Sequence, residues 1–188
     1  MGPYPVLLCG GNPAEQRLAA ELARYGAVMR LQRGTLTQLG TGAAAFLLYE
    51  FDRVPEAALH SGVLLLGSQL PAGRAALPPR LVPVFDSGNA AAVQLLAHRQ
   101  RAGVACGCAP QDTLSLASLS DTQAVVSLQR ELTTLDGARV EPRDLTIRLA
   151  EPGKNDAPRE LFELMALSAV LLLCGRFSDE NSANLRGR

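Results

Sequence analysis

Short, mostly apolar runs separated by turn signals constrain this chain more than any other feature. Such a run is too short for a surface helix, and its apolar character predicts a strand that is buried on both sides. Strands of this kind belong to parallel sheets, in which helices cover both faces. Six such runs occur in the first part of the sequence, at residues 5–10, 27–32, 44–51, 62–68, 81–86 and 103–107.

Helical patterns or crossovers lie between these runs. Asn12 can cap a helix in which Pro13 takes the first position and Glu15 the third. Further helices are expected at residues 55–60 and from Ser87 onward. Strands that alternate with helices or crossovers form a mostly parallel, doubly wound sheet. We therefore predict a three-layer α/β fold for residues 1–111.

The pattern changes at residue 112. Residues 112–150 are β-rich and contain no helical pattern, which predicts an antiparallel extension of the sheet. Within them, Asp136-Gly137 is a strong signal for a tight hairpin. A linker then leads to a closing helix at residues 157–175, and residues 178–188 form a polar, flexible tail. Residues 1–177 are expected to form a single domain.

The balance of charge narrows the possible function classes. The 188 residues include 18 Lys+Arg and 18 Asp+Glu, so no basic field is available to attract nucleic acid. Tryptophan is absent and aromatic residues make up 4%, which excludes a platform for stacking bases. The most apolar run, residues 164–175, is too short to span a bilayer. Because the chain also has no signal-peptide pattern, we expect a cytoplasmic protein that binds neither nucleic acid nor membrane.

The loop after the first run has the outline of a phosphate-binding site without its chemistry. Gly10 and Gly11 end the strand and a helix follows, as in a P-loop. A P-loop also needs a lysine and a Ser/Thr hydroxyl, and this turn has neither. Pro13 removes an N–H donor, and Glu15 brings a negative charge to the place where phosphate would lie. The sequence therefore argues against triphosphate binding.

A dinucleotide site is also incomplete. The third glycine of the G-x-G-x-x-G fingerprint is missing. Arg30 and Arg33 lie near the end of the second strand, where they could meet a 2′-phosphate or simply be solvated.

Several side chains at the expected strand ends are candidate site residues. Cys9 lies beside a helix N-terminus, which would activate its thiol, unless it is a buried structural residue. Glu50 and Asp86 end later strands, on the edge where α/β proteins bind ligands. The C-x-C spacing of Cys106 and Cys108 is unlike that of a zinc site, so we expect no metal.

The loop at residues 106–113 is the most distinctive in the sequence. Small residues, including Cys106, Gly107 and Cys108, form a turn, and Asp112 and Thr113 then enter the β-rich segment. Two interpretations stay open: a tight connection between the sheet and its extension, or a loop that binds a ligand.

Taken in order, these segments resemble the central, ATP-binding domain of the Mur ligases, which form amide bonds in peptidoglycan synthesis. In that family a strand enters a P-loop and a helix, as in VLLCGGNPAEQRLAAEL. A later strand of the family ends in a magnesium-binding glutamate, and AAFLLYEFD resembles it at Glu50. Another strand of the family ends in an aspartate before a helix, and LVPVFDSGNAAAVQLL is similar to it at Asp86. A β-rich segment and an apolar helix follow, much like AGVACGCAPQDTLSLASL and ELMALSAVLLLCG. The resemblance covers most of the chain.

The departures from the family are as informative as the matches. The P-loop lysine, its Ser/Thr, and the family's catalytic lysine and histidine have no counterparts here. The resemblance therefore implies a degenerate bacterial relative, without catalytic residues or a cofactor, whose former nucleotide site is marked by Cys9, Gly10, Gly11, Asn12, Glu50 and Asp86.

We accordingly expect a non-catalytic binding or regulatory domain. Its expected partner is a second copy of the chain or a cell-wall synthesis protein. The alternative is a small enzyme that binds a nucleotide or dinucleotide in the crevice above Gly10 and Gly11.

Overall fold

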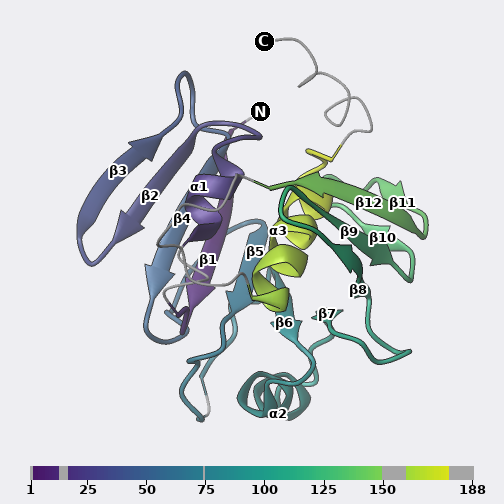
Figure 1. Cartoon of the computed structure of the whole chain (residues 1–188). Coiled ribbons are helices and arrows are strands. Elements are labelled where there is room, and N and C mark those ends of the chain that lie inside the picture. Colours follow the sequence, from purple (N-terminus) through teal and green to yellow (C-terminus); the bar gives the residue numbers. More distant parts are fainter. Residues whose placement is uncertain (1, 13–16, 74, 150–159, 178–188) are drawn as a thin grey trace.

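The computed structural model describes residues 2–12, 17–73, 75–149 and 160–177 (Figure 1). Within these ranges, ten strands form one sheet in the order β12-β9-β8-β7-β6-β5-β1-β4-β2-β3, and β10 and β11 form a second, two-stranded sheet. The strands are β1 (Tyr4–Cys9), β2 (Val28–Gln32), β3 (Thr35–Leu39), β4 (Phe46–Phe51), β5 (Gly62–Leu66), β6 (Leu81–Asp86), β7 (Val104–Cys106), β8 (Leu114–Leu119), β9 (Gln123–Leu128), β10 (Leu132–Thr133), β11 (Arg139–Val140) and β12 (Arg143–Arg148). The helices are α1 (Leu18–Leu22), α2 (Ala90–His98) and α3 (Leu161–Leu173).

The prediction of a mostly parallel sheet is confirmed. Neighbouring strands are parallel from β2 through β4, β1, β5, β6 and β7 to β8. The sheet becomes antiparallel at both ends, where β3 pairs with β2 and where β9 joins β8 to β12. The Asp136-Gly137 turn joins β10 to β11, and Gly137 has the positive φ of 87° that such a turn requires.

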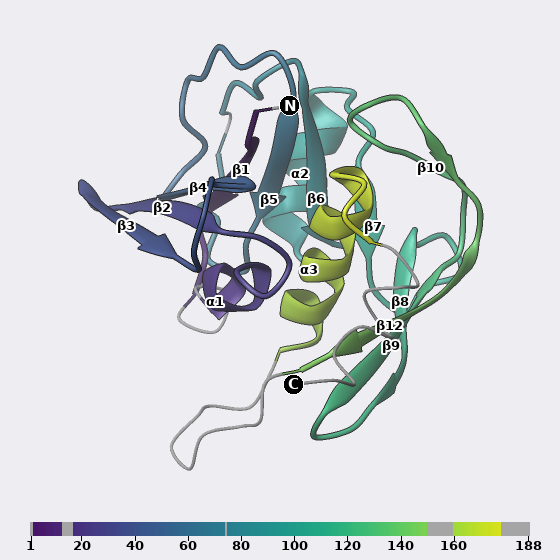
Figure 2. The same ribbon diagram turned by 90° about the horizontal axis from the view of Figure 1, so that it is seen from above.

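The helices divide between the two faces of the sheet (Figure 2). Side chains of α1 and α3 share a core with one face, represented by Val6, Leu8 and Leu65. Side chains of α2 pack on the other face, against Leu7 and Leu64. Every residue of β5 is buried, as its uniformly apolar sequence predicts.

The closing helix α3 is buried on almost all sides, because its sequence is apolar around the whole helix. It crosses the sheet from β5 to β9 and so joins the parallel part to the antiparallel extension. Among the described residues, no helix is long and apolar enough to cross a membrane.

Two local expectations differ from the structure. Residues 55–60 form no helix, since a segment this short gains too few hydrogen bonds to offset helix nucleation. The described part of α1 begins at Leu18, and the expected first turn, with Pro13 and Glu15, lies outside the described residues. The cap of α2 is Asn89 rather than Ser87, because the Asn89 side chain accepts the N–H groups of the first turn. The strand β3 was not expected from the sequence.

Candidate functional site

The carboxyl ends of β1, β4, β5, β6 and β7 share one edge of the sheet, which is where the predicted site residues lie. The chain leaves β1 toward the face covered by α1, whereas after β4 it continues toward the opposite face. Adjacent strands whose connections diverge in this way leave a crevice between them, and α/β proteins bind ligands there. The crevice between β1 and β4 is therefore the place where this fold favours a ligand.

Gly10 forms a tight turn that is held by its neighbours. Its N–H donates to the Phe51 carbonyl at 2.8 Å, and its own carbonyl accepts from the Gln69 N–H at 2.7 Å. Gly10 has a φ of 67°, and a Cβ added there would lie 2.4 Å from the backbone of Leu70. A glycine is thus required because the loop after β5 packs directly against this turn.

Asn12 connects this turn to two distant segments. Its side-chain amide donates to Ser68 Oγ at 2.9 Å and to Glu160 Oε2 at 2.8 Å. Asn12 is only 9% exposed, so these bonds satisfy a largely buried amide. Asn12 thus joins the β1 turn to the loop after β5 and to the start of α3.

Nearby, α1 and α3 are joined by a second polar contact. The Arg17 guanidinium lies 2.9 Å from the carboxylate of Glu163, a side chain that is 2% exposed. A buried carboxylate is stable only with such a partner, so this pair fixes the two helices relative to each other.

Glu50 is paired with a neighbouring arginine. The Arg30 Nε of the adjacent strand β2 lies 2.5 Å from Glu50 Oε1, and the Glu50 side chain is 8% exposed. The pair follows from the sheet register, which places Glu50 beside Gln32 and therefore close to Arg30 on the same face. The carboxylate whose place in the sequence resembles that of a magnesium-binding glutamate is thus compensated by a positive charge.

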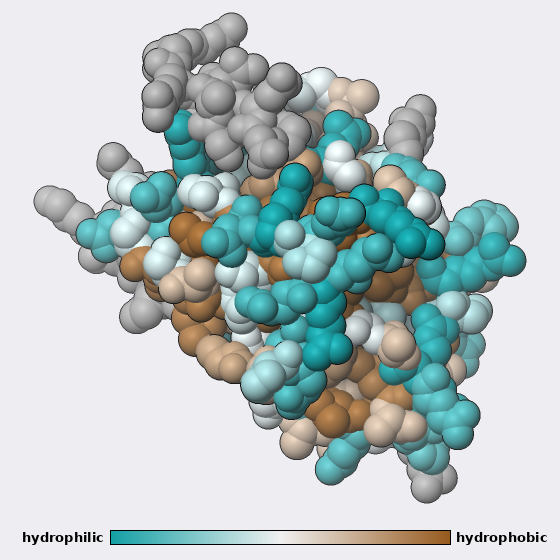
Figure 3. Space-filling model, turned by 90° about the vertical axis from the view of Figure 1, so that its right-hand side faces the viewer, coloured by the Kyte–Doolittle hydropathy of each residue, from teal (hydrophilic) through white to brown (hydrophobic). Residues whose placement is uncertain are grey.

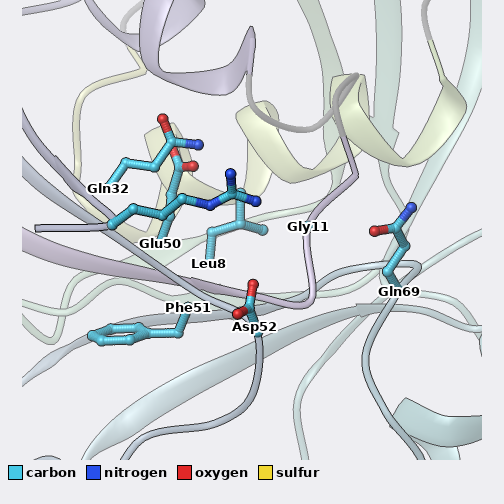
Figure 4. A pocket seen from close by; sticks show the side chains of 8 residues that line it. Leu8, Gly11, Gln32, Glu50, Phe51, Asp52 and Gln69 are labelled. Atoms are coloured by element: carbon cyan, nitrogen blue, oxygen red, sulfur yellow. The ribbon is translucent and has the colours of Figure 1, made fainter. Parts of the chain in front are cut away.

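A polar cavity of about 240 Å³ opens beside this pair, in the crevice between β1 and β4. Figure 4 shows Gln32 and Glu50 on one side, the Asp52 carboxylate below and Gln69 on the far side. Its lining residues are Leu8, Gly11, Gln32, Arg33, Glu50, Phe51, Asp52 and Gln69. The cavity thus offers one guanidinium, two carboxylates and two amides to a small polar ligand.

Asp86 does not belong to this cavity. It ends β6, which is separated from β4 by β5 and β1. Its Oδ1 accepts the Gly88 N–H at 2.8 Å, a local contact that shapes the turn into α2.

The loop at residues 106–113 folds into a close connection around a buried carboxylate. Asp112 Oδ2 accepts from Ser87 Oγ at 3.0 Å and from the Ala109 N–H at 2.8 Å. A Cβ at Gly107 would lie 2.4 Å from the same oxygen, so glycine lets the loop close around Asp112. The Thr113 N–H donates to Ala105 in β7. These contacts stabilise the loop as a close connection between β7 and β8.

The cysteines differ sharply in exposure. Cys9, Cys106 and Cys174 are buried, and Cys108 is exposed. Burial raises the pKa of Cys9 to about 12, so the neighbouring turn does not activate its thiol. Burial also raises the pKa of Cys106. Within the described ranges, no cluster of three or more His, Cys, Asp or Glu could hold a metal ion.

Sequence reasoning found only part of this site. It identified Gly11, Glu50 and Arg33, but not Gln69, whose position depends on how the loop after β5 packs. The interaction between Asn12 and Glu160 spans 148 positions of sequence, and no local signal indicates it.

The fold and the cavity together define an α/β protein with a small polar site at the carboxyl edge of a mostly parallel sheet. Comparison of the chain with models of known protein families gives no match, and comparison with curated protein sequences gives none either.

Proposed function

We propose that this chain is a non-catalytic binding or regulatory domain, a degenerate relative of the Mur ligase central domain. The observation that supports the proposal is that the groups which would meet a phosphate and a metal are used within the protein. The Gly10 N–H donates to Phe51, the Asn12 amide is shared between Ser68 and Glu160, and the Glu50 carboxylate is paired with an arginine of β2. A nucleotide would have to displace these contacts before it gained any of its own.

The size and charge of the cavity support the same proposal. Its volume of about 240 Å³ is below the range of roughly 300–1,000 Å³ that is usual for sites of drug-sized ligands. Arg33 brings one positive charge and Asp52 one negative charge, and the Glu50 carboxylate is paired with Arg30, so the lining has no surplus of positive charge to hold a triphosphate. A small polar molecule suits this cavity better than a nucleotide.

The proposal includes three further features. The first is a three-layer arrangement, supported by α1 and α3 on one face of the sheet and α2 on the other. The second is a cytoplasmic location, supported by four cysteines that are all free thiols. The third is a partner, either a second copy of the chain or a cell-wall synthesis protein.

Isothermal titration calorimetry with ATP and Mg²⁺ tests the absence of nucleotide chemistry. We expect no saturable heat at ligand concentrations of up to about 1 mM, which corresponds to a binding free energy weaker than about −4 kcal/mol. Tight, magnesium-dependent binding of ATP would refute the proposal.

The alternative, a nucleotide- or dinucleotide-binding enzyme, is favoured by one observation. The cavity lies at the position in the sheet where such ligands bind, and Arg33 lines it. A thermal-shift panel of mono- and dinucleotides, run on the unaltered chain, Arg33→Gln and Arg139→Gln, tests this function. Arg139 is a matched control, because its side chain is 77% exposed on β11, far from the cavity. Stabilisation that disappears in Arg33→Gln and persists in Arg139→Gln would establish the alternative.

A further inference from the structure

The strand β3 forms an open edge of the large sheet. Figures 1 and 2 both show it at the outer left of the molecule, away from the helices. Four of its five side chains are exposed, and Leu36 has an exposure of 62%. The turn before β3 contains Arg33 and Gly34 with φ values of 47° and 79°, the two positive values of a two-residue hairpin turn.

This turn determines which backbone groups face outward. In such a hairpin the flanking residues, Gln32 and Thr35, form a hydrogen-bonded pair, and the next pair, Leu31 and Leu36, does not. The N–H and C=O of Leu36 therefore point away from β2, toward the side where a further strand would lie. Gln38, two residues later, has the same orientation.

The two edges of the sheet are protected to different degrees. The opposite edge, β12, carries Arg143, Asp144 and Arg148 among its six residues. Figure 3 views the molecule from that end and shows hydrophilic side chains across the middle of the face. Charged residues on an edge strand oppose the addition of another strand. The sequence of β3, TLTQL, contains no charged residue, so nothing of this kind protects it.

A row of apolar side chains leads to this open edge. The registers align Leu64, Leu7, Tyr49, Leu31 and Leu36 across five neighbouring strands. Residues aligned in this way point to the same face of a sheet. Leu64 and Leu7 are fully buried, Tyr49 and Leu31 are half-buried, and Leu36 is largely exposed, so the row ends in solvent.

We propose that two copies of this chain associate through β3, antiparallel and centred on Leu36, so that their sheets become continuous. In this register the outward N–H and C=O groups of Leu36 bond to those of the partner's Leu36. The two leucines then lie side by side on the same face and join the apolar rows of the two copies. No like charges oppose each other between the paired strands, and the chain has a formal net charge of zero.

The mass in solution, measured by sedimentation or light scattering, tests the association. We expect a dimer of the 19.9 kDa chain and a monomer for Leu36→Lys, which places two like charges opposite each other. The control is Leu119→Lys, which changes another exposed leucine, 46% accessible, at the end of β8. It should remain a dimer, and circular dichroism should show that both variants are folded. A monomeric parent chain, or a dimer of Leu36→Lys, would overturn the proposal.

Disulfide formation tests the register. In a Cys108→Ser background, which removes the exposed native thiol, we expect Leu36→Cys to form a covalent dimer on mild oxidation. The Cα atoms of a hydrogen-bonded pair are about 5.5 Å apart, a separation that a disulfide can bridge. Gln38→Cys should not cross-link, because its two copies would lie four residues apart, roughly 14 Å. Equal cross-linking of both variants would overturn the register.

The proposed dimer rests on the proposed function in one respect, because it identifies the partner of the binding domain as a second copy of the chain. Leu36 is not among the residues that line the cavity, and the mass of the chain is measured without nucleotide. Failure of one proposal is therefore distinguishable from failure of the other.

Discussion

The substitution Gly10→Ala tests whether the β1 turn is held by the protein itself rather than kept open for a ligand. A methyl group at this position would lie 2.4 Å from the backbone N and Cα of Leu70 and 2.8 Å from the carbonyl carbon of Gln69. These are backbone atoms, so the contact cannot be relieved by rotating a side chain. Either the loop after β5 must move or the turn must open.

The expected loss of stability has two parts. An L-residue at the Gly10 φ of 67° costs roughly 1–2 kcal/mol. Overpacking against a well-packed backbone adds typically about 1–3 kcal/mol. We therefore expect Gly10→Ala to lower the free energy of unfolding by about 2–5 kcal/mol.

Gly137→Ala separates these two contributions. Gly137 also has a positive φ, 87°, but a Cβ there would have no atom within 4 Å. This variant should lose only the conformational part, roughly 1–2 kcal/mol. Replacing glycine by alanine restricts the unfolded chain equally in both variants, so that effect cancels in the comparison.

Urea denaturation of the parent chain and the two variants gives the required free energies. The difference between the variants measures the contact between the β1 turn and the loop after β5. If Gly10→Ala is no less stable than Gly137→Ala, the two segments do not pack as described. In that case the turn would be free to receive a phosphate, and the reasoning behind the proposed function would fail.

Two further predictions concern titratable groups. Burial and a hydrogen bond to Asp136 raise the pKa of Tyr4 from its ordinary value of 10.0 to about 12. The stability that Tyr4 contributes is therefore fully present below pH 10, and it is lost as the pH rises toward 12. Urea denaturation at about pH 9 and about pH 11 should show a smaller loss for Tyr4→Phe than for the parent chain; an equal loss would contradict the pKa shift. The second prediction concerns alkylation of the cysteines, followed by mass spectrometry. In the native protein, Cys108 should be modified and the buried cysteines should not, whereas all four should be modified in denaturant. Fast modification of Cys9 in the native protein would mean that the carboxyl edge of the sheet is more open than the structure indicates.

The fold was predictable where local sequence and tertiary packing agree. The strand at residues 81–86 has the predicted bounds, and β1 and β5 were recognised because their apolar sequences suit burial on both sides. The Asp136-Gly137 turn was found because glycine favours the positive φ that Gly137 adopts there. The strand β3 was missed because its sequence, TLTQL, lacks an apolar face and Arg33-Gly34 is a weak turn signal. The strand forms because its backbone hydrogen bonds with β2 stabilise it, although its own side chains give no strand pattern.

The candidate site was less predictable, because its geometry depends on contacts between distant segments. The sequence located Glu50 at a strand end, but its pairing with Arg30 depends on the parallel register of β2 and β4. Asp86 was expected at the same site, and only the strand order shows that two strands separate it from Glu50. The residue types at the strand ends indicated that the site lies at the carboxyl edge of the sheet. Which of those side chains lie close together depends on the strand order, which the sequence alone does not show.

The β2–β3 hairpin connects the two surfaces that the proposals use. Its turn residue Arg33 lines the polar cavity, and Leu36, three positions later, is the centre of the proposed interface. Pairing of β3 with a second copy would restrain this hairpin and with it one wall of the cavity. A ligand that contacts Arg33 would then bind the monomer and the dimer with different affinities, and by linkage it would change the association equilibrium by the same factor. Regulation of this kind requires no catalytic group, since it needs only a binding cavity and an association surface on one structural element.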